Sequence, residues 1–134
     1  MSAKLPVVEK GQGERFVMAS IKHIEIVGTD GGKLKSFYSQ LFDWSITRKD
    51  VAGFDYYDIE LGDKPTVGIR HEPDGKAELV FYVEVDDLDQ SVEKAKELGA
   101  SVRIPPKRSG DLRFALIEDP EGNPIGLTQA SKGE

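Results

Sequence analysis

The feature that most constrains the fold of this chain is an internal repeat. The tripeptide Val67-Gly68-Ile69 is matched by Ile125-Gly126-Leu127, and a glutamate, Glu60 or Glu118, precedes each copy at the same interval. The predicted elements repeat in the same order: one strand, one helix and three further strands occur twice, in units of about sixty residues. Because each unit alone would leave one face of its sheet exposed, we expect the two units to pair.

The first unit is predicted to begin with a strand at 21–27. A helix is indicated by four apolar side chains that recur at helical spacing: Leu34, Phe37, Tyr38 and Leu41. We interpret the last three of these, together with Trp44, as core. Three more strands are expected at 44–48, 54–61 and 66–70.

The second unit repeats this order. A strand at 78–85 precedes a helix that begins after Asp86-Asp87 and ends at Gly99. The remaining strands are expected at 102–104, 112–117 and 124–129. Pro105-Pro106 should end the first of these three, because proline donates no backbone hydrogen bond. Together the two units predict an α+β protein built from two tandem βαβββ modules.

The modules are expected at about residues 18–72 and 77–130, within one domain that covers 18–130. A chain of 134 residues is long enough to bury the core of a single domain. Residues 1–17 are polar and lack clear periodicity, so we expect a flexible N-terminal extension there. Residues 131–134 are expected to form a polar tail.

The composition narrows the classes of function. The formal net charge of −6 at pH 7 argues against nucleic-acid binding, which needs clustered lysine and arginine. The chain holds no cysteine, which excludes disulfides, thiolate nucleophiles and cysteine-ligated zinc. No apolar run is long enough to span a bilayer, and no signal-peptide pattern opens the chain. We expect a cytoplasmic protein that binds no nucleic acid and no membrane, and that accommodates a neutral or cationic small ligand.

One of only two histidines in the chain lies in the first predicted strand. Alternation puts His23 and Glu25 together on one face of this strand, opposite Ile24. Each face mixes polar and apolar residues, so alternation does not say which face is buried. An imidazole beside a carboxylate can be half of a metal site, an acid/base pair or a hydrogen-bonded structural pair.

Three stretches of sequence indicate a known family. They are His23 placed ahead of Phe37-Tyr38, the run Val83-Glu84-Val85-Asp86-Asp87-Leu88, and the run Glu118-Asp119-Pro120-Glu121-Gly122-Asn123-Pro124-Ile125-Gly126-Leu127. Through them, roughly residues 18–130 resemble the vicinal oxygen chelate superfamily, which includes glyoxalase I, extradiol dioxygenases, methylmalonyl-CoA epimerase and bleomycin-resistance proteins. Within this superfamily, these motifs are most similar in sequence to those of the glyoxalase-related group of unassigned function. The resemblance implies curved mixed sheets around a cavity, often completed by a homodimer.

Enzymes of this superfamily hold a divalent metal ion with side chains on the first and fourth strands of each module. The resemblance carries these positions onto His23, Gly68, Val80 and Gly126. Only His23 can bind a metal through its side chain, whereas a catalytic metal needs about three protein ligands. The ligand sets of the glyoxalases and of the dioxygenases are both incomplete. We therefore expect no metal and no other cofactor, with a divalent metal as the alternative.

Because the family position of His23 lines the cavity, we take His23 and Glu25 as candidate catalytic residues. A purely structural pair is an equal alternative. The candidate ligand-binding residues, which could line the concavity of the sheet, are Tyr57, Arg70, Tyr82, Glu84 and Arg113.

Several of these assignments leave an alternative open. Glu84 is interpreted slightly more readily as a residue of an exposed strand face, or as an ion-pair partner of Arg70 or Arg113, than as a cavity residue. Tyr57 and its neighbour Tyr56 point to opposite faces, so only one of them can line the cavity. If Arg113 lines it, the adjacent Phe114 is core. The second histidine, His71, is interpreted as a solvated linker residue.

These observations favour a protein that binds a small organic molecule between its modules, as a homodimer, and performs acid/base chemistry without a metal if it is an enzyme. A first alternative is a metal-dependent lyase or isomerase with an unusual site, formed by His23, Glu25 and a residue of a dimer partner. A second alternative is a bleomycin-resistance-like protein that sequesters its ligand. The sequence does not decide whether catalysis occurs.

Overall fold

The structure is a computed structural model that describes residues 8–10, 14–16, 19–51, 54–62 and 65–130. The first module contains β3 (Ile21–Gly28), α1 (Gly31–Phe42), β4 (Ile46–Val51), β5 (Phe54–Ile59) and β6 (Thr66–His71). The second contains β7 (Glu78–Glu84), α2 (Leu88–Glu97), β8 (Ser101–Ser109), β9 (Leu112–Glu118) and β10 (Pro124–Ala130). The described part of the chain has no helix long and apolar enough to cross a membrane.

Two short strands precede the modules. β1 (Val8–Lys10) pairs antiparallel with β2 (Glu14–Phe16). This hairpin falls in the segment for which the sequence predicts a flexible extension. The predicted tail at 131–134 lies outside the described residues.

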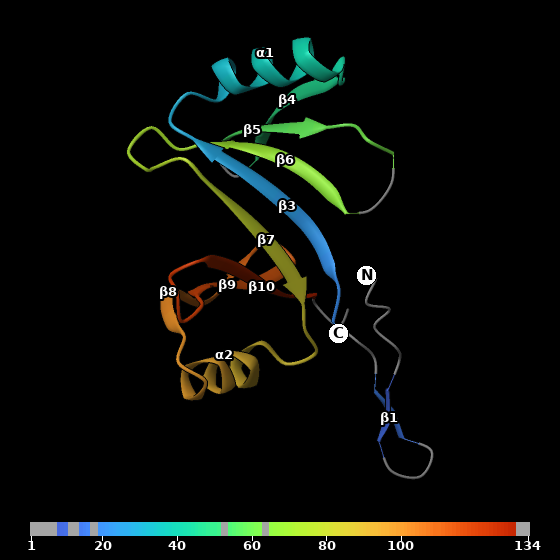
Figure 1. Cartoon of the computed structure of the whole chain (residues 1–134), viewed down its shortest axis with the longest axis vertical. Helices are drawn as coiled ribbons and strands as arrows, with labels where there is room; N and C mark the ends of the chain where they lie inside the picture. Colours follow the sequence, from blue (N-terminus) through green and yellow to red (C-terminus); the bar gives the residue numbers. More distant parts are fainter. Residues whose placement is uncertain (1–7, 11–13, 17–18, 52–53, 63–64, 131–134) are drawn as a thin grey trace.

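The two modules form one eight-stranded sheet of symmetric order, β4-β5-β6-β3-β7-β10-β9-β8. In each module the first strand pairs parallel with the last, β3 with β6 and β7 with β10. The modules join where β3 and β7 pair antiparallel. Figure 1 shows α1 with its strands at one end of the domain and α2 with its strands at the other, with β3 and β7 between them. The predicted α+β fold of two βαβββ modules is confirmed.

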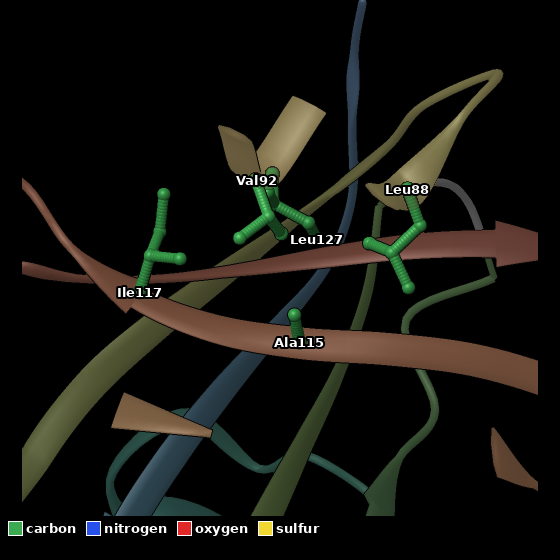
Figure 2. Packing of buried hydrophobic residues seen from close by; sticks show 5 residues of the cluster. All are labelled: Leu88, Val92, Ala115, Ile117 and Leu127. Carbon is green, nitrogen blue, oxygen red and sulfur yellow. The ribbon is translucent and has the colours of Figure 1, made fainter. Parts of the chain in front are cut away.

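Each helix covers the outer face of its own module's strands. Under α1, Tyr57, Ile59 and Ile69 form a buried cluster, against which the half-buried Tyr38 and Trp44 pack. The second cluster is drawn in Figure 2, where side chains from α2 meet side chains from β9 and β10: Leu88, Val92, Ala115, Ile117 and Leu127. Because the helices occupy the outer face, the inner face of the curved sheet is left for a cavity.

Aspartates begin both helices. The Asp30 carboxylate accepts a hydrogen bond from the Lys33 amide at 3.0 Å, and the Asp87 carboxylate accepts one from the Gln90 amide at 3.0 Å. Such N-cap bonds satisfy backbone donors that have no partner within the helix. The second cap lies at the Asp86-Asp87 pair after which the sequence predicts the helix to begin.

Two local expectations are wrong. β8 does not end at Pro105-Pro106 but continues to Ser109, with a register shift between Ile104 and Lys107. The prolines are tolerated because β8 is an edge strand, where a missing amide donor breaks no interior ladder. Phe37 and Leu41, expected in the core, are 56% and 58% exposed. Of the four apolar side chains of α1, Leu34 and Tyr38 pack against the buried cluster, whereas Phe37 and Leu41 lie outside this contact.

Candidate functional site

A cavity of about 610 Å³ lies on the inner face of the sheet and takes side chains from both modules. Its first-module lining consists of Lys22, His23, Glu25, Tyr56, Thr66 and Arg70. Its second-module lining consists of Tyr82, Glu84, Ile104, Ser109, Leu112, Phe114, Leu116 and Thr128. This volume is typical of small-molecule sites.

Glu25 is the buried charge of this cavity, with 8% of its surface exposed. Its Oε1 atom accepts hydrogen bonds from Arg70 Nε at 3.1 Å and from the Tyr82 hydroxyl at 3.0 Å. Arg70 in turn donates from Nη1 to Glu72 at 2.8 Å. Among the described residues, Glu25 Oε2 receives no hydrogen bond, although His23 Nε2 lies 3.9 Å away. The carboxylate is therefore fixed through one oxygen while the other stays available.

His23 is held from both sides of its ring. Nδ1 lies 2.7 Å from the Thr66 hydroxyl, and Nε2 lies 2.6 Å from the Tyr56 hydroxyl. The Thr66 hydroxyl itself donates to the Lys22 carbonyl, so it accepts from Nδ1–H. A neutral imidazole has one donor and one acceptor nitrogen, which leaves Nε2 to accept from Tyr56.

Burial sets the protonation of this group of side chains. It lowers the pKa of the His23 imidazole, an effect that the carboxylates of Glu25 and Asp58 oppose without reversing it. Burial, and next the charge of Glu25, raise the pKa of both Tyr56 and Tyr82 well above its usual range. At neutral pH the cavity therefore holds a neutral imidazole and two protonated hydroxyls.

The four positions at which the superfamily holds its metal do not suit a metal here. Glu25 pairs with Gly68 on β6, and Tyr82 pairs with Gly126 on β10, so Val80 is the second-module equivalent of His23. A Cβ atom at Gly68 would overlap the Tyr56 hydroxyl, and one at Gly126 would overlap the Tyr82 ring. Tyrosine side chains thus fill the space over both glycines.

Val80 is fully buried beside Val27 and Leu116 and offers no donor atom. His23 uses both of its nitrogens within the protein. Within the described residues, no group of three or more histidine, aspartate or glutamate side chains is placed to hold a metal. The donor set does not fit the family's metal.

The structure brings together most of the residues that the sequence singles out. His23, Glu25, Arg70, Tyr82 and Glu84 all line the cavity, although their roles stay predictions. Glu84 lies at the rim, 4.0 Å from Lys22, and pairs with neither of the arginines considered for it.

Tyr57 and Arg113 do not line the cavity. Tyr57 is buried on the outer face under α1, and its neighbour Tyr56 lines the cavity instead. Arg113 reaches Asp89 on α2, with Nη2 and Oδ1 3.2 Å apart. The adjacent Phe114, expected in the core, faces the cavity.

The alternation of side chains along β5 indicates that Tyr56, rather than Tyr57, faces the cavity. Tyr57 shares its face with Ile59, which is apolar and therefore belongs under a helix, whereas Tyr56 shares its face with Asp58. No comparable signal exists for Phe114, because both faces of β9 are largely apolar.

His71, expected in a solvated linker, ends β6 and is half buried. Its Nδ1 accepts a hydrogen bond from the Gly31 amide at 2.9 Å, at the first residue of α1. The imidazole therefore satisfies one of the free donors at the helix N-terminus.

Fold and site together define a class: paired βαβββ modules around a cavity, as in vicinal oxygen chelate proteins. The model of the glyoxalase-like domain family matches residues 24–128, and the chain belongs to that family. A protein named "Putative glyoxylase CFP32" in Mycobacterium tuberculosis and Mycobacterium bovis is 32% identical over 117 residues, which is 81% of this chain. The match covers 45% of those relatives, so the chain spans about half of their length.

Solved structures share the fold at low sequence identity. A hypothetical protein of Bacillus halodurans aligns with a TM-score of 0.64 and 12% identity, over 87% of this chain and 97% of that one. A variant of methylmalonyl-CoA epimerase from Streptomyces coelicolor, in complex with 2-nitronate-propionyl-CoA, gives 0.61 and 15% over 87% and 97%. The methylmalonyl-CoA epimerase of Mycobacterium tuberculosis gives 0.59 and 14% over 83% and 87%.

Proposed function

We propose that this protein binds a small organic molecule in its cavity and moves a proton to or from it without a metal ion. The observation that supports this most is the asymmetry of Glu25. One carboxylate oxygen is fixed by Arg70 and Tyr82, and the other faces the cavity with no hydrogen bond from the described residues. A positioned carboxylate with a free oxygen is suited to act as a general base.

His23 supports the base in this proposal through its neutral ring. The Tyr56 hydroxyl donates a hydrogen bond to Nε2, which fixes the orientation of the ring in the cavity. The ring keeps its own proton at Nδ1, toward Thr66. Since the direct distance from Nε2 to Glu25 is 3.9 Å, the two residues act on a ligand from separate atoms rather than as one hydrogen-bonded pair.

The metal-dependent lyase or isomerase is the weaker candidate, because the donor set does not fit. Its test is a calorimetric titration of protein purified without chelator, using Ni²⁺, Zn²⁺, Mn²⁺ and Fe²⁺. We expect no stoichiometric binding of any of these ions. Binding of one equivalent of metal ion that is lost in His23→Ala would establish a metal site and favour the metal-dependent lyase or isomerase.

Sequestration, as in bleomycin-resistance proteins, is the second candidate. The cavity has an apolar wall that includes Phe114 and Leu116, and such a wall provides affinity without any chemistry. A ligand that binds tightly and is never converted would favour this function.

The test of the proposal begins with a thermal-shift screen of small organic molecules in the presence of a chelator. Hits should stabilise the wild type, and their affinity should fall in His23→Ala. For each hit that carries a C–H next to a carbonyl, NMR in D₂O follows deuterium uptake at that carbon. We expect the wild type to accelerate the uptake and Glu25→Gln to lose a factor of about 100 or more. Uptake that is equal in both would remove proton transfer from the proposal.

The homodimer and the cytoplasmic location also stay proposals. Apolar side chains on the outer side of β7, Leu79 and Phe81, are 64% and 37% exposed, which supports a partner for that face. The curated relatives, at about twice this length, have room for a second domain of this size. Light scattering after gel filtration would give the oligomeric state directly.

A further inference from the structure

The cavity has two chemically different halves. Its first-module end is polar and contains Glu25, His23 and Tyr56. The second module adds an apolar wall, which is made by Ile104, Leu112, Phe114 and Leu116. Leu112 is 41% exposed although it faces a concave surface. An apolar wall of this kind gains free energy when a ligand covers it.

At the polar end, the groups around Glu25 and His23 already donate hydrogen bonds within the protein. Arg70 spends Nε on Glu25 and Nη1 on Glu72. The Tyr82 hydroxyl donates to Glu25, the Tyr56 hydroxyl donates to His23, and His23 donates to Thr66. The second oxygen of Glu25 remains for a ligand as an acceptor, while Arg70 Nη2 and the Lys22 ammonium remain as donors farther from that oxygen's partners. The hydroxyls of Ser109 and Thr128, elsewhere in the lining, can donate or accept and so do not discriminate.

The charges of the cavity lead to the same conclusion. Each of its two cations already lies beside a carboxylate: Arg70 beside Glu25 and Glu72, and Lys22 beside Glu84 at the rim. The imidazole of His23 adds no positive charge at neutral pH, since burial lowers its pKa. An anionic head group would therefore meet Glu25 with no uncompensated cation to offset the repulsion.

We propose that the ligand of this cavity has a head group that donates a hydrogen bond to Glu25, an alcohol, phenol or amine, and an apolar body that covers Phe114 and its neighbours. Carboxylates and other anionic head groups should bind more weakly at this position, because they would lie against the Glu25 carboxylate. The inference rests on the proposed binding function and specifies its ligand class. It does not depend on whether the ligand is converted.

A matched set of naphthalenes tests the head group by calorimetry at pH 7 in the presence of a chelator. 2-Naphthol offers a neutral donor, 2-naphthylmethylamine a cationic donor, 2-methoxynaphthalene no donor and 2-naphthoate an anion. A hydrogen bond to a charged group changes affinity about tenfold or more. We therefore expect both donors to bind at least about tenfold more tightly than the ether, and the carboxylate to bind most weakly.

Three variants locate the effect. Glu25→Gln should bring 2-naphthol to within about threefold of 2-methoxynaphthalene, because the charged acceptor is gone. Phe114→Ala should weaken both of these probes by a similar factor, because both share the apolar body. Leu98→Ala removes a side chain that is 70% exposed at the end of α2, outside the cavity, and should change neither affinity.

The outcomes separate this inference from the binding function on which it rests. If the carboxylate or the ether binds as tightly as 2-naphthol and Phe114→Ala weakens all of them, the cavity binds ligands but does not select a head group that donates to Glu25. If no probe binds the wild type, or Leu98→Ala weakens binding as much as Phe114→Ala, the cavity itself is not the binding site. The affinities of the four naphthalenes for the wild type test this selection even if Glu25→Gln fails to fold.

Discussion

At the scale of single residues, His23 should couple the stability of the fold to pH. The unfolded chain takes up a proton near the usual pKa of 6.5, whereas burial delays this uptake in the folded protein to a lower pH. Between the two values the unfolded state binds more protons, so the free energy of unfolding falls as the pH falls below 6.5. Above pH 6.5 the His23 ring is neutral in both states, so the protein keeps the full free energy of unfolding that the buried neutral ring allows.

Urea unfolding of the wild type and His23→Gln between pH 7.5 and 5.5 measures this coupling. We expect the wild type to lose more stability than the variant over that interval. An NMR titration of the His23 ring should give a midpoint below 6.5. A midpoint above 6.5 would mean that the ring gains its charge more easily when folded, and equal losses in both proteins would mean that folding does not change the pKa of His23.

Gly68 is the residue on which the position of Tyr56 depends. An alanine methyl there would overlap the Tyr56 hydroxyl, so the ring must move and its hydrogen bond to His23 Nε2 is lost. We expect Gly68→Ala to cost about 1–3 kcal/mol of stability and to change the ¹⁵N shifts of the His23 ring. Chemical denaturation and NMR check the two effects. Unchanged ring shifts would show that Tyr56 does not hold His23.

The sequence identifies His23 and Glu25 as cavity residues through the family position of the histidine and the alternation of one strand. It misses Tyr56, although alternation sets Tyr57 beside Ile59 on the apolar face. The selection of Arg113 over Phe114 fails for a different reason. The strand that carries them is apolar on both sides, since one side faces α2 and the other a cavity whose wall is apolar.

At the scale of elements, alanine substitutions at the two glycines that begin α1 should change the free energy of unfolding in opposite directions. A Cβ at Gly31 would press on the Tyr57 ring at 2.7 Å and on His71 Cβ at 3.0 Å. A Cβ at Gly32 would meet its nearest neighbour at an ordinary 3.7 Å. Gly32→Ala should therefore raise the free energy of unfolding by up to about 1 kcal/mol, and Gly31→Ala should lower it.

Urea unfolding of the two variants against the wild type decides this prediction. A loss of stability in Gly32→Ala would show that the start of the helix is set by something other than space and helix propensity. A gain in Gly31→Ala would show that Tyr57 and His71 can move away from the glycine.

The element order was predictable because each helix and strand carries its own period and its own stop signal. The length of β8 was not, because the effect of Pro105-Pro106 depends on whether the strand lies at the edge of the sheet. The exposure of Phe37 and Leu41 likewise depends on how much of α1 the strands below it can cover. Both are properties of the assembled sheet rather than of a local sequence window.

At the scale of the whole molecule, the two modules should unfold together. Val80 on β7 is fully buried against Val27 on β3 and Leu116 on β9, so one cluster spans both modules. Val80→Ala removes buried methyl groups there and should cost about 2 kcal/mol.

The single tryptophan, Trp44, reports on the first module, whereas far-UV circular dichroism reports on both. The two urea curves should coincide in the wild type and shift together to lower urea in Val80→Ala. A variant in which only the circular dichroism curve moves would show that the modules are separate folding units.

Glu25 is the proposed acceptor for an apolar molecule whose head group donates a hydrogen bond in this glyoxalase-like cavity, with no metal bound. A crystal structure of the protein soaked with both 2-naphthol and Zn²⁺ would show whether the naphthol or the metal occupies this position. We expect the naphthol oxygen within about 3 Å of the Glu25 carboxylate, the rings against Phe114, and His23 still hydrogen-bonded to Tyr56 and Thr66. A zinc ion coordinated by His23 and Glu25, with Tyr56 displaced, would contradict it.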